Sequence, residues 1–140
     1  MNKPILRHIK KIEYCAAYHL KRAIILPAQS RALIKDVMPW QEIPIIGLTE
    51  VETTEEVENG IRLSTTKLTA TLCKRFQSSS KPLAFRLTDV QGKQYLLGTV
   101  RSPYPLITQM ESHEDKAAAT TTYILSIHHI AEKTLLEIHT

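Results

Sequence analysis

The chain has 140 residues, of which 43% are hydrophobic, with 18 Lys and Arg against 14 Asp and Glu. These ordinary proportions exclude a disordered or collagen-like chain, and the length indicates one globular domain over residues 1–140 with one core. No apolar run approaches the roughly 20 residues of a membrane span, so no membrane partner is expected.

Two cysteines, Cys15 and Cys73, are too few for a disulfide framework. They favour reduced thiols and folding inside a cell, with a bridge between the two as the open alternative. The first residues, MNKPILRHIKK, carry charge but lack the apolar segment of a secretory signal.

Residues 5–20 are compatible with two structures. Apolar side chains recur at helical spacing, at Ile5, Leu6, Ile9, Ile12, Ala16, Ala17 and Leu20. The part from Ile9 to Cys15 is also rich in β-branched and aromatic residues, which favours a strand. The periodicity favours the helix. Residues 21–42 contain Pro27 and Pro39, and we expect an irregular connection with a helical turn at Ala32 to Val37.

The strongest local signal is Asn59-Gly60, which lies between two β-like runs in a hairpin spanning residues 46–73. Both residues tolerate positive φ, as a two-residue type I′ turn requires, so the turn fixes the register of the strands. The expected cross-strand pairs are Glu58–Ile61, Thr53–Thr66, Glu52–Lys67, Val51–Leu68 and Ile46–Cys73.

Toward the tip of this hairpin both faces carry polar side chains. We therefore expect residues 50–66 to project as an arm rather than to join the core. The candidate contact residues of this arm are Glu50, Glu52, Glu55, Glu56, Glu58, Asn59, Gly60, Arg62 and Lys67.

The rest of the chain reads as short strands joined by turns. A serine-rich loop at 74–81 leads to a second hairpin, 83–88 with 94–99, which turns at Gly92. A stiff turn at 101–105 precedes a strand at 106–111, a loop at 113–119, and strands at 121–129 and 135–139. These segments predict a mainly β fold, an antiparallel β-sandwich or partly closed barrel with a long β-hairpin arm and one helical element.

Charge is segregated along the sequence. Residues 1–35 are basic, residues 36–60 carry acidic side chains and no Lys or Arg, and residues 61–100 are basic again. Such blocks attract each other, either within one molecule or between copies. Neutralisation inside one chain is the simpler interpretation, and for contacts between copies the candidate counter-charges are Lys10, Lys11 and Arg22.

The sequence shows no catalytic pattern. Its four glycines are isolated, which excludes a phosphate-binding loop, and nucleophile-elbow, HExxH and CxxC motifs are absent. Glu50 and Glu52 lie on an exposed ribbon, where no burial would separate their pKa values. We expect a non-enzymatic protein without a cofactor.

Histidines do not form a convincing metal site. His8, Cys15 and His19 share one stripe of the expected helix, but two helical turns, about 10 Å, separate the first two. His128 and His129 are neighbours in a strand and therefore point to opposite faces. No bound metal is expected.

An alternative function is the binding of single-stranded nucleic acid by a small basic β-barrel. The residues that favour it are Lys10, Lys11, Lys21, Arg22, Lys74 and Arg75, with Tyr14 and Tyr18 nearby. The aromatic content of 6% and the acidic ribbon, which would repel phosphates, argue against it.

The overall pattern resembles small structural proteins of tailed-bacteriophage virions, of the tail-tube and tail-completion types. The resemblance spans 43–139 and depends on the Asn59-Gly60 arm, the Leu97-Gly98-Thr99 strand end and Pro103-Tyr104-Pro105, which precedes a threonine-rich strand.

This resemblance implies a subunit that oligomerises into rings through sheet edges, with hairpin arms reaching neighbouring rings. A ring contact of this kind joins one surface of a subunit to a different surface of the next. The expected partners are further copies of the chain and other virion proteins, and the expected location is the virion after folding in a bacterial host cytoplasm.

Overall fold

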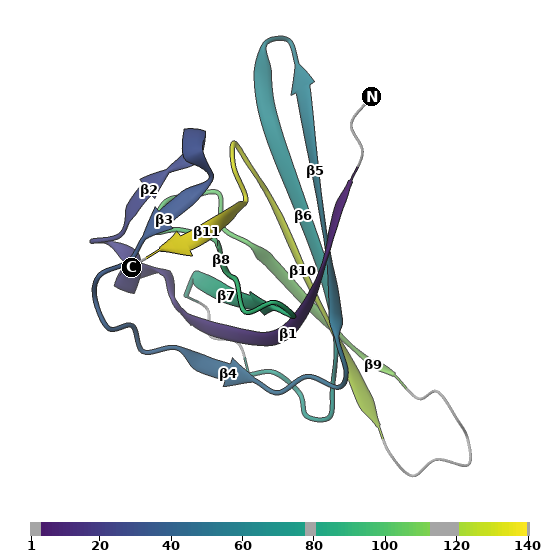
Figure 1. The fold of residues 1–140 in the computed structure, drawn as a ribbon. Helices are drawn as coiled ribbons and strands as arrows, with labels where there is room; N and C mark the ends of the chain where they lie inside the picture. The colour runs from purple at the N-terminus through teal and green to yellow at the C-terminus, as the bar shows by residue number, and fades with distance from the viewer. Residues whose placement is uncertain (1–3, 78–80, 113–120, 140) are drawn as a thin grey trace.

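The computed structural model describes residues 4–77, 81–112 and 121–139, and its architecture is mainly β (Figure 1). In chain order the elements are β1 (Ile5–Ala16), the 3-10 turn η1 (Ala17–Leu20), β2 (Ile24–Leu26), the 3-10 turn η2 (Pro27–Gln29), β3 (Arg31–Leu33), β4 (Gln41–Ile43), β5 (Thr49–Glu58), β6 (Ile61–Leu72), β7 (Leu83–Asp89), β8 (Gln94–Leu97), β9 (Leu106–Ser112), β10 (Thr122–Ala131) and β11 (Leu135–His139). The predicted β class is confirmed.

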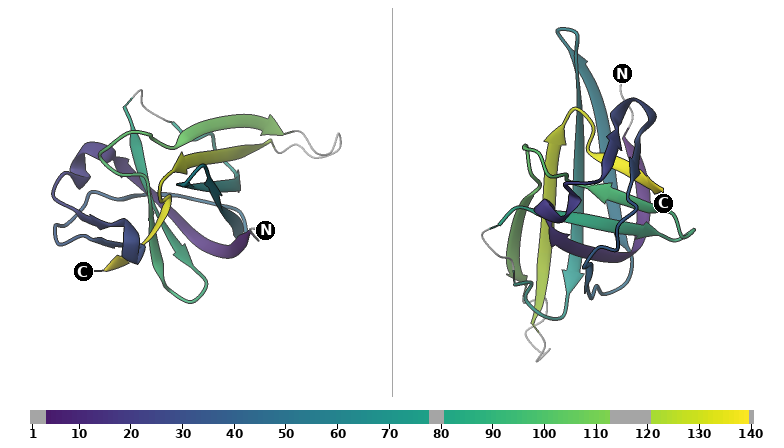
Figure 2. Two further views of the ribbon diagram at one scale, coloured as in Figure 1. Left: turned by 90° about the horizontal axis from the view of Figure 1, so that it is seen from above. Right: turned by 90° about the vertical axis from the view of Figure 1, so that its left-hand side faces the viewer.

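All eleven strands belong to one open sheet. Its order is β2-β3-β11-β8-β7-β1-β5-β6-β10-β9, and β4 pairs with β1 beside this path. The pairs are antiparallel except for β3 with β11, so the sheet is mixed. The sheet folds over on itself: β5, β6, β10 and β9 form one tall layer, and β7, β8, β11, β3 and β2 pack beside it (Figures 1 and 2).

Strand β1 connects the two layers, and the expectation of a helix over 5–20 was wrong. Its first half pairs with β5 from Ile5 to Ile9, and its second half pairs with β7 up to Ala16. The register shifts between Ile9 and Lys11, a bulge that bends a strand and increases its twist. Pairing on both sides outweighs the helical periodicity, and only Ala17–Leu20 keep a helical conformation as η1.

The segment expected to be irregular also contains strands. Ala32 is fully buried in β3, where it pairs with Ile25 on one side and with Ile138 on the other. The helical turn expected at 32–37 is therefore wrong. One of its two neighbours, β11, lies 106 residues further along the chain, as the pairing of Ala32 with Ile138 shows, beyond the reach of local propensity.

Two apolar cores lie on the two faces of the β7–β8–β11 layer. The first fills the space between the layers and joins side chains such as Val51 and Leu125 to Phe85 and Leu97. The second includes Leu96 and Leu136, and residues from the 17–40 segment cover it. Because β7, β8 and the start of β11 are buried on both faces, this layer is the more rigid base of the molecule.

The remaining strands lie close to the positions predicted from the sequence. The second hairpin turns at Gly92, whose φ is 92°, and the buried carboxylate of Asp89 accepts hydrogen bonds from the backbone N–H groups of Gln91 and Lys93, both at 2.9 Å. β9, β10 and β11 lie within a few residues of their predicted bounds. The loop predicted at 113–119 and part of the 74–81 loop lie outside the described residues.

Gly98 is required at the end of β8 for two reasons. Its φ of 94° disfavours any residue with a side chain, and a Cβ added there would lie 2.9 Å from Cγ of Pro105. Gly92 has nearly the same φ, but a Cβ there would meet nothing within 4 Å.

We predict that Gly92→Ala lowers the free energy of unfolding by about 1 kcal/mol through backbone strain alone. Gly98→Ala is expected to cost about 1–3 kcal/mol more, because the new methyl group also displaces Pro105. Urea denaturation of the two variants measures both values. Equal losses would show that Pro105 moves aside freely.

Candidate functional site

The β5–β6 hairpin has the register that Asn59-Gly60 predicts. The ladder runs without interruption from Glu58↔Ile61 to Glu50↔Thr69. Asn59 and Gly60 have φ values of 52° and 77°, both in the left-handed region that a type I′ turn uses. The ladder ends before the expected Ile46–Cys73 pair, because β5 begins at Thr49 and Ile46 instead donates its N–H to the carbonyl of Thr71 at 2.8 Å.

The inner face of the arm is anchored by hydroxyl groups, contrary to the expectation that residues 50–66 have no buried face. Thr53, Ser64 and Thr66 are buried, as is Thr134 in the β10–β11 turn. Thr134 Oγ1 lies 2.6 Å from Thr66 Oγ1 and 2.8 Å from Ser64 Oγ, and Thr66 Oγ1 lies 3.1 Å from Thr53 Oγ1. Polar side chains on both faces predict exposure, but the hydrogen bonds among these hydroxyl groups allow them to be buried.

An ion pair forms a second contact between the arm and the β10–β11 turn. Lys133, in the same β10–β11 turn, donates a hydrogen bond to the carboxylate of Glu55. That bond lowers the pKa of the Glu55 carboxyl, and the positive charges of Lys133 and Arg62 act in the same direction. Glu55 is therefore neutralised within its own chain and is a weak candidate for contact with a neighbour.

The part of the arm that projects freely is consequently shorter than expected and comprises its tip, residues 56–63. This tip rises above the rest of the molecule (Figures 1 and 2). Three large apolar side chains are exposed on it: Val57 is 65% exposed, Ile61 61% and Leu63 41%. In the ladder Val57 lies opposite Arg62, whereas Leu63 lies opposite Glu56, so Val57 is on one face of the tip and Ile61 and Leu63 are on the other.

The outer face of the arm is acidic. Glu50, Glu52 and Glu56 alternate along β5 and so point to the same side, away from the core. Glu52 lies opposite Lys67 in the predicted register, and a shallow hollow of about 230 Å³ runs between them and His128 of β10. The structure therefore brings Glu50, Glu52 and Glu56 together on one face, whereas Glu55 points inward.

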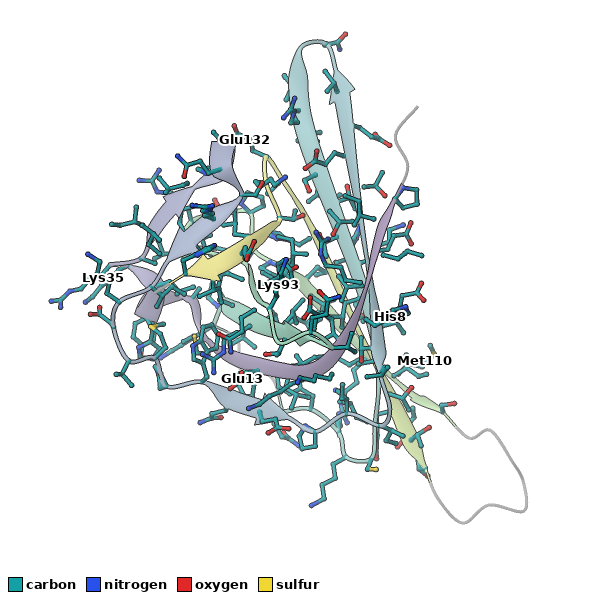
Figure 3. All side chains as sticks on the ribbon, in the orientation of Figure 1. His8, Glu13, Lys35, Lys93, Met110 and Glu132 are labelled. Atoms are coloured by element: carbon teal, nitrogen blue, oxygen red, sulfur yellow. The ribbon has the colours of Figure 1, made fainter. Side chains whose placement is uncertain are left out.

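The three candidate counter-charges lie apart from one another. Lys10 is exposed at the bulge of β1, and the ammonium of Lys11 lies 3.9 Å from the carboxylate of Glu13 in its own chain. Arg22 is exposed just after η1, in the segment that covers the second core. Lys35 of the same segment lies on the opposite side of the molecule from His8 and Met110 (Figure 3).

A hollow of about 360 Å³ lies beside a half-buried ion pair that the sequence did not reveal. Arg86 Nε and Nη2 donate to the two carboxylate oxygens of Glu13 at 2.8 and 2.7 Å, and the guanidinium lies 5.0 Å from the ring centre of Trp40. Both oxygens of Glu13 are thus occupied. The pair links β1 to β7 and does not present an acid or a base to the hollow.

The cysteines and histidines of the described residues do not form a cluster of ligands. Cys15 and Cys73 are free thiols, as predicted, and burial raises the pKa of the Cys15 thiol to about 11. Because 5–16 is a strand, His8, Cys15 and His19 do not form a helical stripe. Among the residues with described positions, no group of three or more His, Cys, Asp or Glu could hold a metal ion.

His128 and His129 point to opposite faces, as predicted. His129 is buried, and its Nε2 lies 3.0 Å from the carbonyl oxygen of Pro103, to which it donates as the neutral Nε2–H tautomer. Nδ1 has no hydrogen-bond partner among the described residues. Burial lowers the pKa of His129 below its ordinary value of 6.5, and the neighbouring His128 acts in the same direction.

Comparisons with known proteins found no match, whether to protein-family models, curated proteins or solved structures. No helix in the described parts of the chain is long and apolar enough to cross a membrane. The function must therefore be inferred from the surfaces described above.

We predict a pH dependence of stability from His129. Its pKa is lower in the folded than in the unfolded chain, so the unfolded chain binds more protons once the pH falls below about 6.5. The stabilisation is complete above that pH and is lost as the pH falls through the folded pKa.

Urea midpoints between about pH 7.5 and about pH 5 measure this loss for the wild type and for His129→Gln, whose amide can still donate to Pro103. The variant should show a smaller loss of stability with acid. His8→Gln, which changes an exposed histidine of β1, is the matched control and should keep the wild-type pH profile. A His129→Gln profile parallel to the wild type would contradict the assignment.

Proposed function

We propose that this chain is a non-enzymatic structural protein that assembles with copies of itself, as a tube or tail-completion subunit of a bacteriophage tail. The observation that carries the proposal is the exposed apolar tip of the arm at Val57, Ile61 and Leu63. An apolar end on a projecting hairpin is poorly solvated, and covering it with another surface removes that cost.

The lower half of the arm is also held in one orientation. Hydroxyl contacts to Thr134 and the Lys133–Glu55 pair fix its lower half to the β10–β11 turn. A tip on a fixed base loses little conformational freedom when it binds, so more of its contact energy appears as affinity. This favours an arm used for assembly over a solvent-exposed turn with no partner.

Charge supports a contact between unlike surfaces. Glu50, Glu52 and Glu56 make one face of the arm acidic, whereas Arg22 is exposed in the segment between η1 and β2, next to Lys21. A contact of the arm with that segment of a second copy is heterologous, and it closes into a ring or continues as a tube. The assignment to a bacteriophage tail rests on the resemblance of the sequence pattern to small tail proteins.

The apolar part of the proposal predicts a loss of assembly in the double variant Val57→Ser/Ile61→Ser. Light-scattering mass after size exclusion is expected to show species larger than the 15.9 kDa chain for the wild type and a shift to the monomer for the variant. The matched control is Val90→Ser/Val100→Ser, which removes two exposed valines from turns away from the arm. A monomeric wild type, or an equal loss in the control, would contradict the role of the tip.

The charged part predicts a charge-swap rescue. Glu56→Lys and Arg22→Glu should each weaken assembly, and the two together should restore part of it, because opposite charges then face each other again. Sedimentation of the single and double variants at low and high salt measures this effect. Glu55 is unsuitable for the swap, since its partner Lys133 is in the same chain. Additive losses without rescue would exclude Arg22 as the contact.

A further inference from the structure

The segment that follows β1 carries an exposed aromatic residue among basic side chains. Tyr18, in η1, is 55% exposed, although most aromatic residues of the chain are buried or half-buried. By contrast, Tyr14 donates its hydroxyl to Gln41 at 2.7 Å and packs edge-on against Phe76. Tyr14 is therefore part of the structure, and Tyr18 is available to a ligand.

Packing and hydrogen bonds fix the backbone that carries Tyr18. Its neighbours Ala17 and Leu20 are 3% and 2% exposed and belong to the second core. The Ala17 N–H donates to the carbonyl of Pro82 at 2.9 Å, and the Ala23 N–H donates to that of Leu20 at 3.0 Å. The ring is thus presented from a fixed turn, which limits the entropy lost when a ligand stacks on it.

Cationic and aromatic groups surround the exposed ring. The His19 ring lies 4.1 Å from that of Tyr18, centre to centre, with a 35° tilt, and the ammonium of Lys81 lies 5.9 Å from the Tyr18 ring centre. A groove of about 230 Å³ beside the ring is lined by Lys21 and Arg22 and by the backbone segment that includes Val37 and Met38.

A second, adjoining hollow of about 140 Å³ adds Lys35 to this surface. Asp36 is the one acidic side chain that lines the two hollows. We name the group formed by Tyr18, His19, Lys21, Arg22, Lys35 and Lys81 the basic aromatic patch. Lys35 extends outward at the margin of the molecule (Figure 3).

We propose that the basic aromatic patch binds single-stranded nucleic acid, with a base stacked on Tyr18 and phosphates against Lys21, Arg22 and Lys35. Stacking on an exposed ring needs an unpaired base, since a duplex keeps its base faces covered. Cations spaced along a groove match a phosphate backbone, and Asp36 reduces but does not cancel their charge.

The proposal does not depend on the assembly role, and its test uses residues that the assembly proposal leaves aside. Fluorescence anisotropy of a labelled oligothymidylate of about 20 nucleotides, at about 50 mM salt, measures binding to the full chain. Tyr18→Ala is expected to weaken binding about tenfold, and Tyr18→Phe, which keeps the ring, to leave it unchanged.

Salt dependence tests the phosphate contacts. Three contacts give a slope of log K against log salt of about −2, and Lys35→Ala should reduce its magnitude by about 0.7. The matched control is Lys93→Ala, an exposed lysine in the β7–β8 turn, which should change neither affinity nor slope. Circular dichroism confirms that each variant is folded.

Three results would overturn the proposal. The first is the absence of saturable binding up to about 100 μM protein, the weak limit of non-specific contacts. The second is a Tyr18→Ala variant that binds as tightly as the wild type. The third is equal competition by a duplex or by polyglutamate of the same charge, which would identify the patch as a general site for acidic chains, including the arm of another copy.

Discussion

The pairing of β1 with both layers is the constraint on which the rest of the fold depends. Its first half hydrogen-bonds to β5 and its second half to β7, and the bulge after Ile9 lets one strand serve both. Side chains from the two halves, Ile9 and Ile12, are fully buried in the core between the layers. The Glu13–Arg86 pair joins β1 to β7 at the point where the second core begins.

The arm illustrates how polar residues can be both buried and stable. A chain of hydroxyls from Thr53 to Ser64 meets its hydrogen-bonding needs through Thr134, so burial leaves few groups unpaired. Leaving one such group without a partner would cost about 1–3 kcal/mol. The result is a hairpin whose base is rigid and whose tip, residues 56–63, stands free with its apolar side chains in solvent.

Two surfaces of different character belong to different elements of the same fold, the arm to β5 and β6 and the basic aromatic patch mainly to the segment from η1 to β4. The arm combines an apolar tip with an acidic face, and the basic aromatic patch combines Tyr18 with lysine and arginine side chains. Their opposite charge makes them complementary to each other and also suits them to different ligands. Whether a second copy or a nucleic acid strand occupies the patch depends on stacking at Tyr18, which a carboxylate-rich surface does not supply.

The sequence by itself determined the features that depend on neighbouring residues. Asn59-Gly60 set the register of β5 and β6, Gly92 marked the next hairpin, and alternating apolar residues identified β10 and β11. Local conformational preference and side-chain alternation are sufficient for these, because the interacting residues are close along the chain.

Only the tertiary structure decided the features that depend on distant partners. β1 became a strand because β5 and β7 hydrogen-bond to it, and Glu13 and Arg86 pair across 73 positions. Hydrogen bonding to Thr134 allows the threonines of the arm to be buried. The packing of Ala17 and Leu20 leaves Tyr18 exposed between them. Burial is a property of what packs against a residue, and the residue's own type and neighbours do not specify it.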